Sequence, residues 1–203
     1  MDNYLKKAIE MYPNAGCELN YTTNFSFLVA VMLSAQTTDK HVNQITPILF
    51  EKYKDEFDLS NANFNDVFNI IKPLGLANNK TKSLIALAKE IVRLNGIPNN
   101  ISDLQKLPGI GYKTACVYMC QIHNEPHIAV DTHVMRVANR LGLVDSTNPE
   151  VISKLLESRY KKEEYIKAHH TYLFLGRYKC TSKNPKCESC LLSSLCKYFK
   201  ENN

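Results

Sequence analysis

Apolar residues recur along most of the chain at the period of a helix with one buried face. In residues 84–91 they fall three or four positions apart, which predicts an amphipathic helix, and Gly96 with Pro98 predicts its end. Residues 25–33 are apolar on nearly every side and predict a central, buried helix. The other helical patterns cover residues 39–50, 65–71, 101–105, 114–119, 132–141, 149–157 and 162–178.

Strand signals are missing from this pattern. No convincing pair of alternating segments and no hairpin signature occurs, so the sequence predicts an all-α fold. No Gly/Ser linker separates two domains. A polar turn at residues 123–127, HNEPH, is the best place for a boundary, and it would leave a group of four cysteines in the later half.

Composition narrows the class of protein. The 203 residues are 44% hydrophobic, with a formal net charge of +5, which fits a nucleic-acid partner and many ordinary enzymes equally well. No apolar run approaches the roughly 20 residues that span a bilayer. The N-terminus lacks the features of a secretory signal. We therefore expect no membrane association and, in a bacterium, a cytoplasmic protein at the nucleoid.

Seven cysteines in a chain without a secretory signal argue against a disulfide framework. Cys17, Cys116 and Cys120 lie among apolar neighbours and are predicted to be small core residues. The other four occupy 17 residues near the end of the chain and need a separate explanation.

These four follow the pattern C-x6-C-x2-C-x5-C, with Cys180, Cys187, Cys190 and Cys196. Thiolates bind soft metals and iron–sulfur clusters, so the spacing predicts a tetrathiolate centre. A redox pair of Cys187 and Cys190 is the alternative, but it is typical of a βαβ context. Spacing does not separate zinc from [4Fe–4S], although structural zinc usually uses two distant pairs.

A centre with four cysteine ligands has no open position, so we expect a structural role. Lys183 and Lys186 lie in the first loop of this pattern. A loop fixed at both ends by metal ligands would present these cations rigidly. Two solvated lysines on an exposed loop are the alternative.

The segment LPGIGYKTACVYM, residues 107–119, predicts a tight turn followed by a helix. Gly109 and Gly111 allow backbone angles closed to other residues and a close approach of another backbone. Backbone amides at such a turn and helix N-terminus bind anions. With the short helix at 101–105, this predicts a helix-hairpin-helix that grips DNA phosphates; a plain helix–helix turn is the alternative.

Lys113 falls in the first turn of that helix, where the helix dipole disfavours a cation. A partly desolvated, neutral lysine amine can attack a carbonyl carbon and form a Schiff base. The alternative is a solvated lysine that attracts phosphate. Asp131 stands just before the helix predicted at 132–141, where it would be an N-cap. A capping carboxylate is also rigid and could stabilise positive charge on a sugar.

Together these motifs resemble the endonuclease III family of DNA glycosylase/AP lyases. The similar segments are LPGIGYKTA, VDTHVMRVANRLGL, the cysteine pattern, MLSAQTTDKHVN, IKPLGLANNKTKSL and HHTYLFLGRYKC, and they cover nearly the whole chain. The resemblance implies two helical lobes with a DNA cleft between them. Residues 17–125 would form a six-helix bundle with the hairpin. Residues 1–16 and 126–203 would form the lobe with a [4Fe–4S] cluster.

The same resemblance assigns roles to individual residues. Lys113 matches the nucleophile and Asp131 the essential carboxylate. Gln36 matches a residue that fills the gap left by an extruded nucleotide, and Leu76 matches a wedge in the opposite strand, although it could equally be a core leucine. The cluster ligands would be Cys180, Cys187, Cys190 and Cys196. The contacts to the DNA backbone would come from Gly109, Gly111, Lys183 and Lys186.

The implied function is base excision repair by a monomer. Its substrate would be double-stranded DNA with an oxidised pyrimidine or an abasic site, cut 3′ to that site by β-elimination. Two departures are small: Tyr112 stands where a basic residue is common, and the chain ends soon after Cys196, without room for an extra recognition domain.

The sequence also allows three alternative functions. Mismatch adenine glycosylases usually lack the lysine and carry a glutamate near Ala30, and mismatch thymine glycosylases also lack the lysine. A non-catalytic DNA-binding module would need neither Lys113 nor Asp131.

Overall fold

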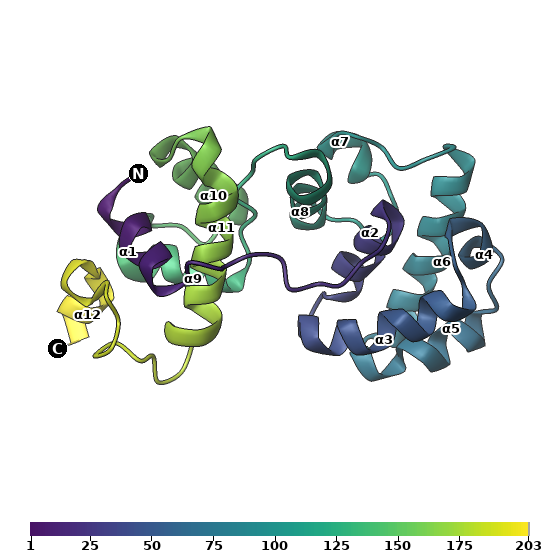
Figure 1. Cartoon of the computed structure of the whole chain (residues 1–203), viewed down its shortest axis with the longest axis horizontal. Helices are drawn as coiled ribbons and strands as arrows, with labels where there is room; N and C mark the ends of the chain where they lie inside the picture. The colour runs from purple at the N-terminus through teal and green to yellow at the C-terminus, as the bar shows by residue number, and fades with distance from the viewer. Residues whose placement is uncertain (203) are drawn as a thin grey trace. The chain divides into compact units, whose positions relative to one another are not determined.

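A computed structural model describes residues 1–202. Within this range the chain contains helices and connecting segments and no strand, so the all-α prediction is confirmed (Figure 1). The chain forms two compact units, residues 18–124 and residues 1–17 with 125–203. No helix in the described part is long and apolar enough to cross a membrane.

The unit of residues 18–124 is built around α2 (Asn24–Leu33), whose residues from Phe25 onward are all buried. Thr23 caps this helix and Ser26 closes a capping box. Helix α2 packs on α3 and α8, while α4 and α5 pack on α6 (Figure 1). The remaining elements are α3 (Asp39–Lys52), α4 (Glu56–Ser60), α5 (Phe64–Ile71), η1 (Lys72–Leu74), α6 (Ala77–Arg93), α7 (Ile101–Leu104) and α8 (Tyr112–His123).

Helix α6 has the apolar face that the pattern predicts, with Leu84, Leu87, Ala88 and Ile91 buried. It begins seven residues before Leu84, at Ala77, in a polar stretch without an apolar repeat. Its end lies where Gly96 predicts it, because Asn95 and Gly96 both have positive φ.

The other unit joins the two ends of the chain. Leu5 and Ala8 of α1 (Asn3–Met11) are fully buried and share a core with residues from 128 to 192. The hydroxyl of Tyr4 donates a hydrogen bond to the carbonyl of Leu195. The other elements are α9 (Thr132–Leu141), α10 (Pro149–Arg159), η2 (Lys162–Glu164), α11 (Tyr165–Phe174), η3 (Leu175–Lys179), η4 (Ser193–Leu195) and α12 (Lys197–Asn202).

The single helix predicted at 162–178 is three elements. A 3₁₀ turn precedes α11, and a π-helical turn, η3, follows it. Gly176 in that turn lies so close to α9 that a Cβ would be 2.8 Å from the Cβ of His133. The wider turn and the glycine bring this segment against α9, directly before Cys180.

Candidate functional site

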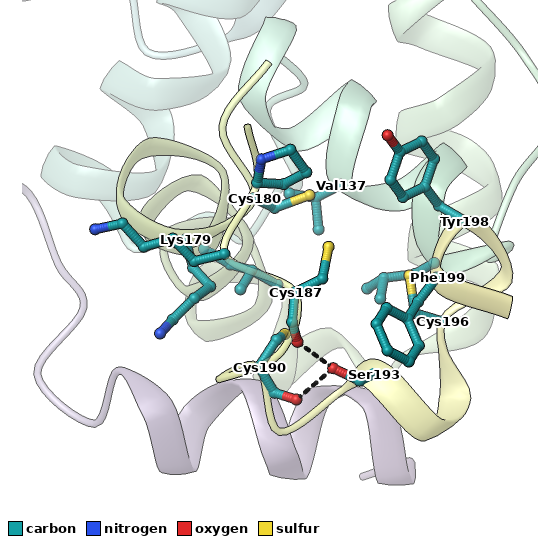
Figure 2. A pocket seen from close by; sticks show the side chains of 13 residues that line it. Val137, Lys179, Cys180, Cys187, Cys190, Ser193, Cys196, Tyr198 and Phe199 are labelled. Atoms are coloured by element: carbon teal, nitrogen blue, oxygen red, sulfur yellow. Dashed lines mark hydrogen bonds between the residues drawn. The ribbon is translucent and has the colours of Figure 1, made fainter. Parts of the chain in front are cut away.

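The four clustered cysteines lie around one cavity. Figure 2 shows Cys180, Cys187, Cys190 and Cys196 facing a common space whose other walls are largely apolar. None of these four forms a disulfide. Among residues 1–202 no three His, Cys, Asp or Glu side chains are close enough to hold a single metal ion. The four thiols line one cavity, an arrangement suited to a multi-atom cluster.

The surroundings of two of these cysteines favour the protonated thiol over the thiolate. Burial raises the pKa of Cys187 and of Cys190, and repulsion from the thiolates of Cys180 and Cys196 raises both pKa values further. A bound metal centre removes this repulsion and keeps its thiol ligands deprotonated. The donor set and its surroundings thus fit an iron–sulfur cluster.

The loop between the first two cysteines is fixed through its backbone. The N–H of Lys186 donates to the carbonyl of Lys179 at 3.1 Å. The carbonyl of Lys183 accepts a hydrogen bond from the Thr181 hydroxyl at 2.9 Å. Both lysine side chains are exposed. The loop therefore presents two cations from a defined backbone, as the sequence suggests.

The hairpin lies between α7 and α8, with Leu107 and Ile110 buried beneath it. Gly109 has φ +77°, and a Cβ there would lie 2.9 Å from the Cβ of Ser83. Gly111 precedes α8 without a side-chain cap, and nothing lies within 4 Å of where its Cβ would be. The first turn of α8 thus has backbone N–H groups available for an anion.

Lys113 is the second residue of α8, as the sequence predicts, and its side chain is exposed. The protein around it therefore does not bury this side chain, contrary to the partial desolvation that the sequence suggests. Its backbone lies in the first turn of α8, where the helix dipole places partial positive charge. Lys113 belongs to the unit of residues 18–124.

Asp131 belongs to the other unit and is the N-cap of α9. Its Oδ1 accepts hydrogen bonds from the backbone N–H groups of His133 and Val134, both at 2.9 Å. These bonds fix the orientation of the carboxylate. The capping interpretation is correct, and it is compatible with a catalytic role because the capping bonds use only Oδ1 and hold the carboxylate in one orientation.

Gln36 and Leu76 share an unusual backbone geometry. Their φ angles are +58° and +51°, and among the described residues the only other non-glycine residues with positive φ are three asparagines. Asparagine tolerates this region, whereas leucine and glutamine do so at a cost in free energy. Leu76 is 53% exposed, which rules out the core alternative. Strain of this kind gathers at functional sites.

Comparison with known proteins identifies the family. Residues 29–162 match the model of the HhH-GPD superfamily base excision DNA repair proteins, and residues 180–196 match the iron-sulfur binding domain of endonuclease III. Endonuclease III of Bacillus subtilis (strain 168) is 41% identical over 196 residues, which cover 95% of this chain and 90% of that protein. This chain belongs to the endonuclease III family.

Other endonuclease III proteins agree with this assignment. The Escherichia coli (strain K12) protein is 35% identical over 96% of this chain and 93% of its own length. A solved structure of a non-covalent endonuclease III–DNA complex superimposes with a TM-score of 0.94 at 39% identity, covering 98% of this chain and 94% of that chain. A thermostable thymine-DNA glycosylase, at 24% identity and a TM-score of 0.85, shares the fold.

Membership of the endonuclease III family confirms three predictions. The protein is a base excision repair DNA glycosylase and AP lyase, it binds DNA, and its cofactor is a [4Fe–4S] cluster. The zinc and redox-pair alternatives for the cysteines are thereby excluded. Ala30, at the position where adenine glycosylases would carry glutamate, is fully buried in α2.

Two arginines of α9 were not singled out by sequence reasoning. Arg140 donates to the carbonyls of Thr181 and Ser182 at 2.7 and 3.1 Å, and it lies 3.5 Å from Sγ of Cys180. Arg136 donates to the carbonyl of Cys180 at 2.9 Å. They hold the start of the cysteine segment on α9. The sequence signal is their spacing of four residues, which places both on one face of a helix.

Proposed function

We propose that this member of the endonuclease III family excises oxidised pyrimidines from duplex DNA and cuts the strand 3′ to the abasic site, with Lys113 as nucleophile. The observation that carries the proposal is the exposed amine of Lys113 at the start of α8, directly after the LPGIG hairpin. Mismatch glycosylases of the superfamily typically lack this lysine, and a non-catalytic module would not need it.

The first step is extrusion of the damaged nucleotide, because its C1′ cannot be reached inside the stack. Unstacking costs a few kcal/mol, and least for a lesion that already stacks badly. Gln36 would fill the vacated position and Leu76 would enter the opposite strand. Their exposed, strained positions support this assignment, because side chains that enter DNA must project from the protein surface.

The chemical steps then follow from the amine. Neutral Lys113 attacks C1′, the N-glycosidic bond breaks, and the base leaves with the bonding electrons. The attacking nitrogen loses a proton, and the departing base takes one up. The sugar ring opens as the C1′–O4′ bond breaks and O4′ takes a proton, which gives a Schiff base. Loss of a C2′ proton and cleavage of the C3′–O bond release the 3′ strand. Water then hydrolyses the imine and restores the amine.

Asp131 would accept the proton of the Lys113 ammonium and stabilise the positive charge that develops on the sugar. Its hydrogen bonds to the first turn of α9 support this role, because they orient the carboxylate before substrate arrives. Cys180, Cys187, Cys190 and Cys196, which line one cavity, would hold the [4Fe–4S] cluster, and the bound cluster would supply a structural crosslink.

Phosphate contacts would come from the hairpin amides at Gly109 and Gly111 and from Lys183 and Lys186. The proposed unit of action is one chain at the nucleoid, bound to DNA that contains a damaged base or an abasic site. Its functional lobes would be the hairpin lobe, 17–125, and the cluster lobe, 1–16 with 126–203.

Borohydride trapping tests the proposal. The protein is incubated with duplexes that carry thymine glycol, uracil or an abasic site, with and without borohydride. We expect a covalent adduct on thymine glycol and abasic DNA and none on uracil, and no adduct with Lys113→Ala. Normal adduct formation by Lys113→Ala would overturn the assignment of the nucleophile, and preferential action on uracil would overturn the lesion class.

A further inference from the structure

Lys80 on α6 is a lysine buried in the protein interior. Only 6% of its surface is exposed, and burial lowers the pKa of its amine. Lysine is almost never buried so fully without a specific partner. Here the partner is a backbone carbonyl, because Nζ of Lys80 donates a hydrogen bond to the oxygen of Leu74 at 3.0 Å.

This carbonyl belongs to the turn that carries Leu76. Leu74 ends η1 and is buried, whereas Gly75 and Leu76 both have positive φ, +70° and +51°. The backbone N–H of Lys80 also donates to the carbonyl of Leu76 at 3.0 Å. Lys80 therefore binds the turn on both sides of Gly75, once through its side chain and once through its backbone.

The turn needs such support for a physical reason. A leucine in the left-handed region costs free energy, and the exposed Leu76 side chain gains little by burial in return. The turn of α6 that follows Lys80 is itself held in place, because Ser83 in that turn lies against Gly109 of the hairpin. One face of α6 thus contacts both the turn at Leu76 and the hairpin.

We propose that Lys80 is a positioning residue that holds Leu76 in the conformation that enters the DNA stack. This inference rests on the proposed function, in which Leu76 is the wedge. Lys80 does not touch DNA in this role; it acts through the carbonyl of Leu74. Removing its amine would leave a folded protein whose Leu76 turn samples other conformations.

The test compares Lys80→Met with Lys82→Met in the cluster-containing full-length protein. Lys82 is exposed on the same helix, so its replacement removes an equal charge without affecting the turn. Two quantities are measured: the single-turnover excision rate on thymine glycol, and the fluorescence of 2-aminopurine placed opposite an abasic analogue, which rises as that base loses its stacking. Both are repeated in a Leu76→Ala background.

We expect Lys80→Met and Leu76→Ala each to lower the rate by about tenfold, equivalent to roughly 1.4 kcal/mol, and to reduce the fluorescence rise, while Lys82→Met does neither. We expect Lys80→Met to have no further effect once Leu76 is alanine, because residues that act as a unit are non-additive. If Lys80→Met does not fold, Lys80→Gln replaces it in the same cycle.

Two outcomes overturn the inference: equal behaviour of the Lys80 and Lys82 variants, or full additivity of Lys80→Met with Leu76→Ala. Additivity would show that Lys80 serves stability alone. A Leu76→Ala protein with normal rate and normal fluorescence would instead remove Leu76 from the proposed function. Schiff-base formation by Lys113 is measured separately by trapping, so failure of the two proposals can be distinguished.

Discussion

At the scale of single residues, Asp131 uses the same carboxylate for folding and, in the proposed function, for chemistry. Asparagine caps a helix about as well as aspartate does, but it carries no charge. We therefore expect Asp131→Asn to change the free energy of unfolding by less than about 1 kcal/mol. Excision should slow by about 100-fold or more, because the proton acceptor is lost.

Urea denaturation and single-turnover excision measure these two effects on the same preparation. Lys82→Met is a suitable control for handling and cluster content, since its side chain is exposed and outside the proposed machinery. An Asp131→Asn protein that excises at the normal rate would reduce Asp131 to a capping residue.

Gly109 gives a second prediction at this scale. Its φ of +77° and the 2.9 Å approach of a Cβ to Ser83 leave no room for a side chain. We expect Gly109→Ala to destabilise the protein by about 1–3 kcal/mol. Gly111→Ala, where φ is −90° and the space is open, should cost less than about 1 kcal/mol. Equal urea midpoints for the two variants would contradict the structure of the hairpin.

At the scale of elements, the loop between Cys180 and Cys187 is short and fixed, so its two lysines should act together on DNA. The double variant Lys183→Ala/Lys186→Ala should reduce the slope of log K against log salt concentration by about 1.8, because each phosphate contact contributes about 0.9. Fluorescence anisotropy at several salt concentrations measures this slope.

A matched control replaces Lys6 and Lys154, which are exposed on α1 and α10. It removes the same charge and should leave the slope closer to that of the unaltered protein. If both double variants change the slope equally, the loop lysines contribute to DNA binding only through the net charge of the protein and not through specific phosphate contacts.

The sequence predicts elements well where an apolar face or a cap marks them. Helices α2 and α9 begin and end within one residue of the predicted limits, because their burial and caps agree. Helices α1, α4 and α12 were not predicted. The latter two are short, five and six residues, and too brief for a repeat to register. Helix α1 is stabilised by packing on α11, a contact between distant parts of the chain.

At the scale of the whole molecule, the chemistry was easier to predict than the supporting structure. The cysteine spacing and the glycine hairpin each lie within a short segment of the sequence, so the metal centre and the DNA-binding turn could be predicted from the sequence alone. The burial of Lys80 and the contacts of Arg136 and Arg140 depend on the tertiary fold. A polar segment such as NNKTKS, residues 78–83, gives no sign that one of its lysines lies inside.

Buried tyrosines make the molecule sensitive to alkali. Burial raises the pKa of Tyr118 and of Tyr160 to about 12, against 10 in the unfolded chain. Because the pKa of these hydroxyls is higher in the folded state, their contribution to the free energy of unfolding is fully present below pH 10. It is lost as the pH rises towards about 12. Tyr160 and Tyr172 also share a hydrogen bond between their hydroxyls.

We expect Tyr160→Phe to be less stable by about 1 kcal/mol at pH 7, because the hydroxyl of Tyr172 loses its hydrogen-bond partner. Between pH 10 and 12 the free energy of unfolding of this variant should fall by about 1–2 kcal/mol less than that of the unaltered protein. Thermal denaturation across this pH range measures the difference. Parallel stability curves would show that Tyr160 does not control the alkaline transition.

The junction of both chain ends in one unit has a consequence for synthesis on the ribosome. Residues 18–124 emerge as a contiguous block and can fold early, whereas α1 must wait until residues from 125 onward have been translated. At about 5–20 residues per second, translation of residues 125–203 takes roughly 4–16 seconds. In the proposed function, a nascent chain that ends before residue 131 would carry the nucleophile, Lys113, without the carboxylate of Asp131 that accepts its proton.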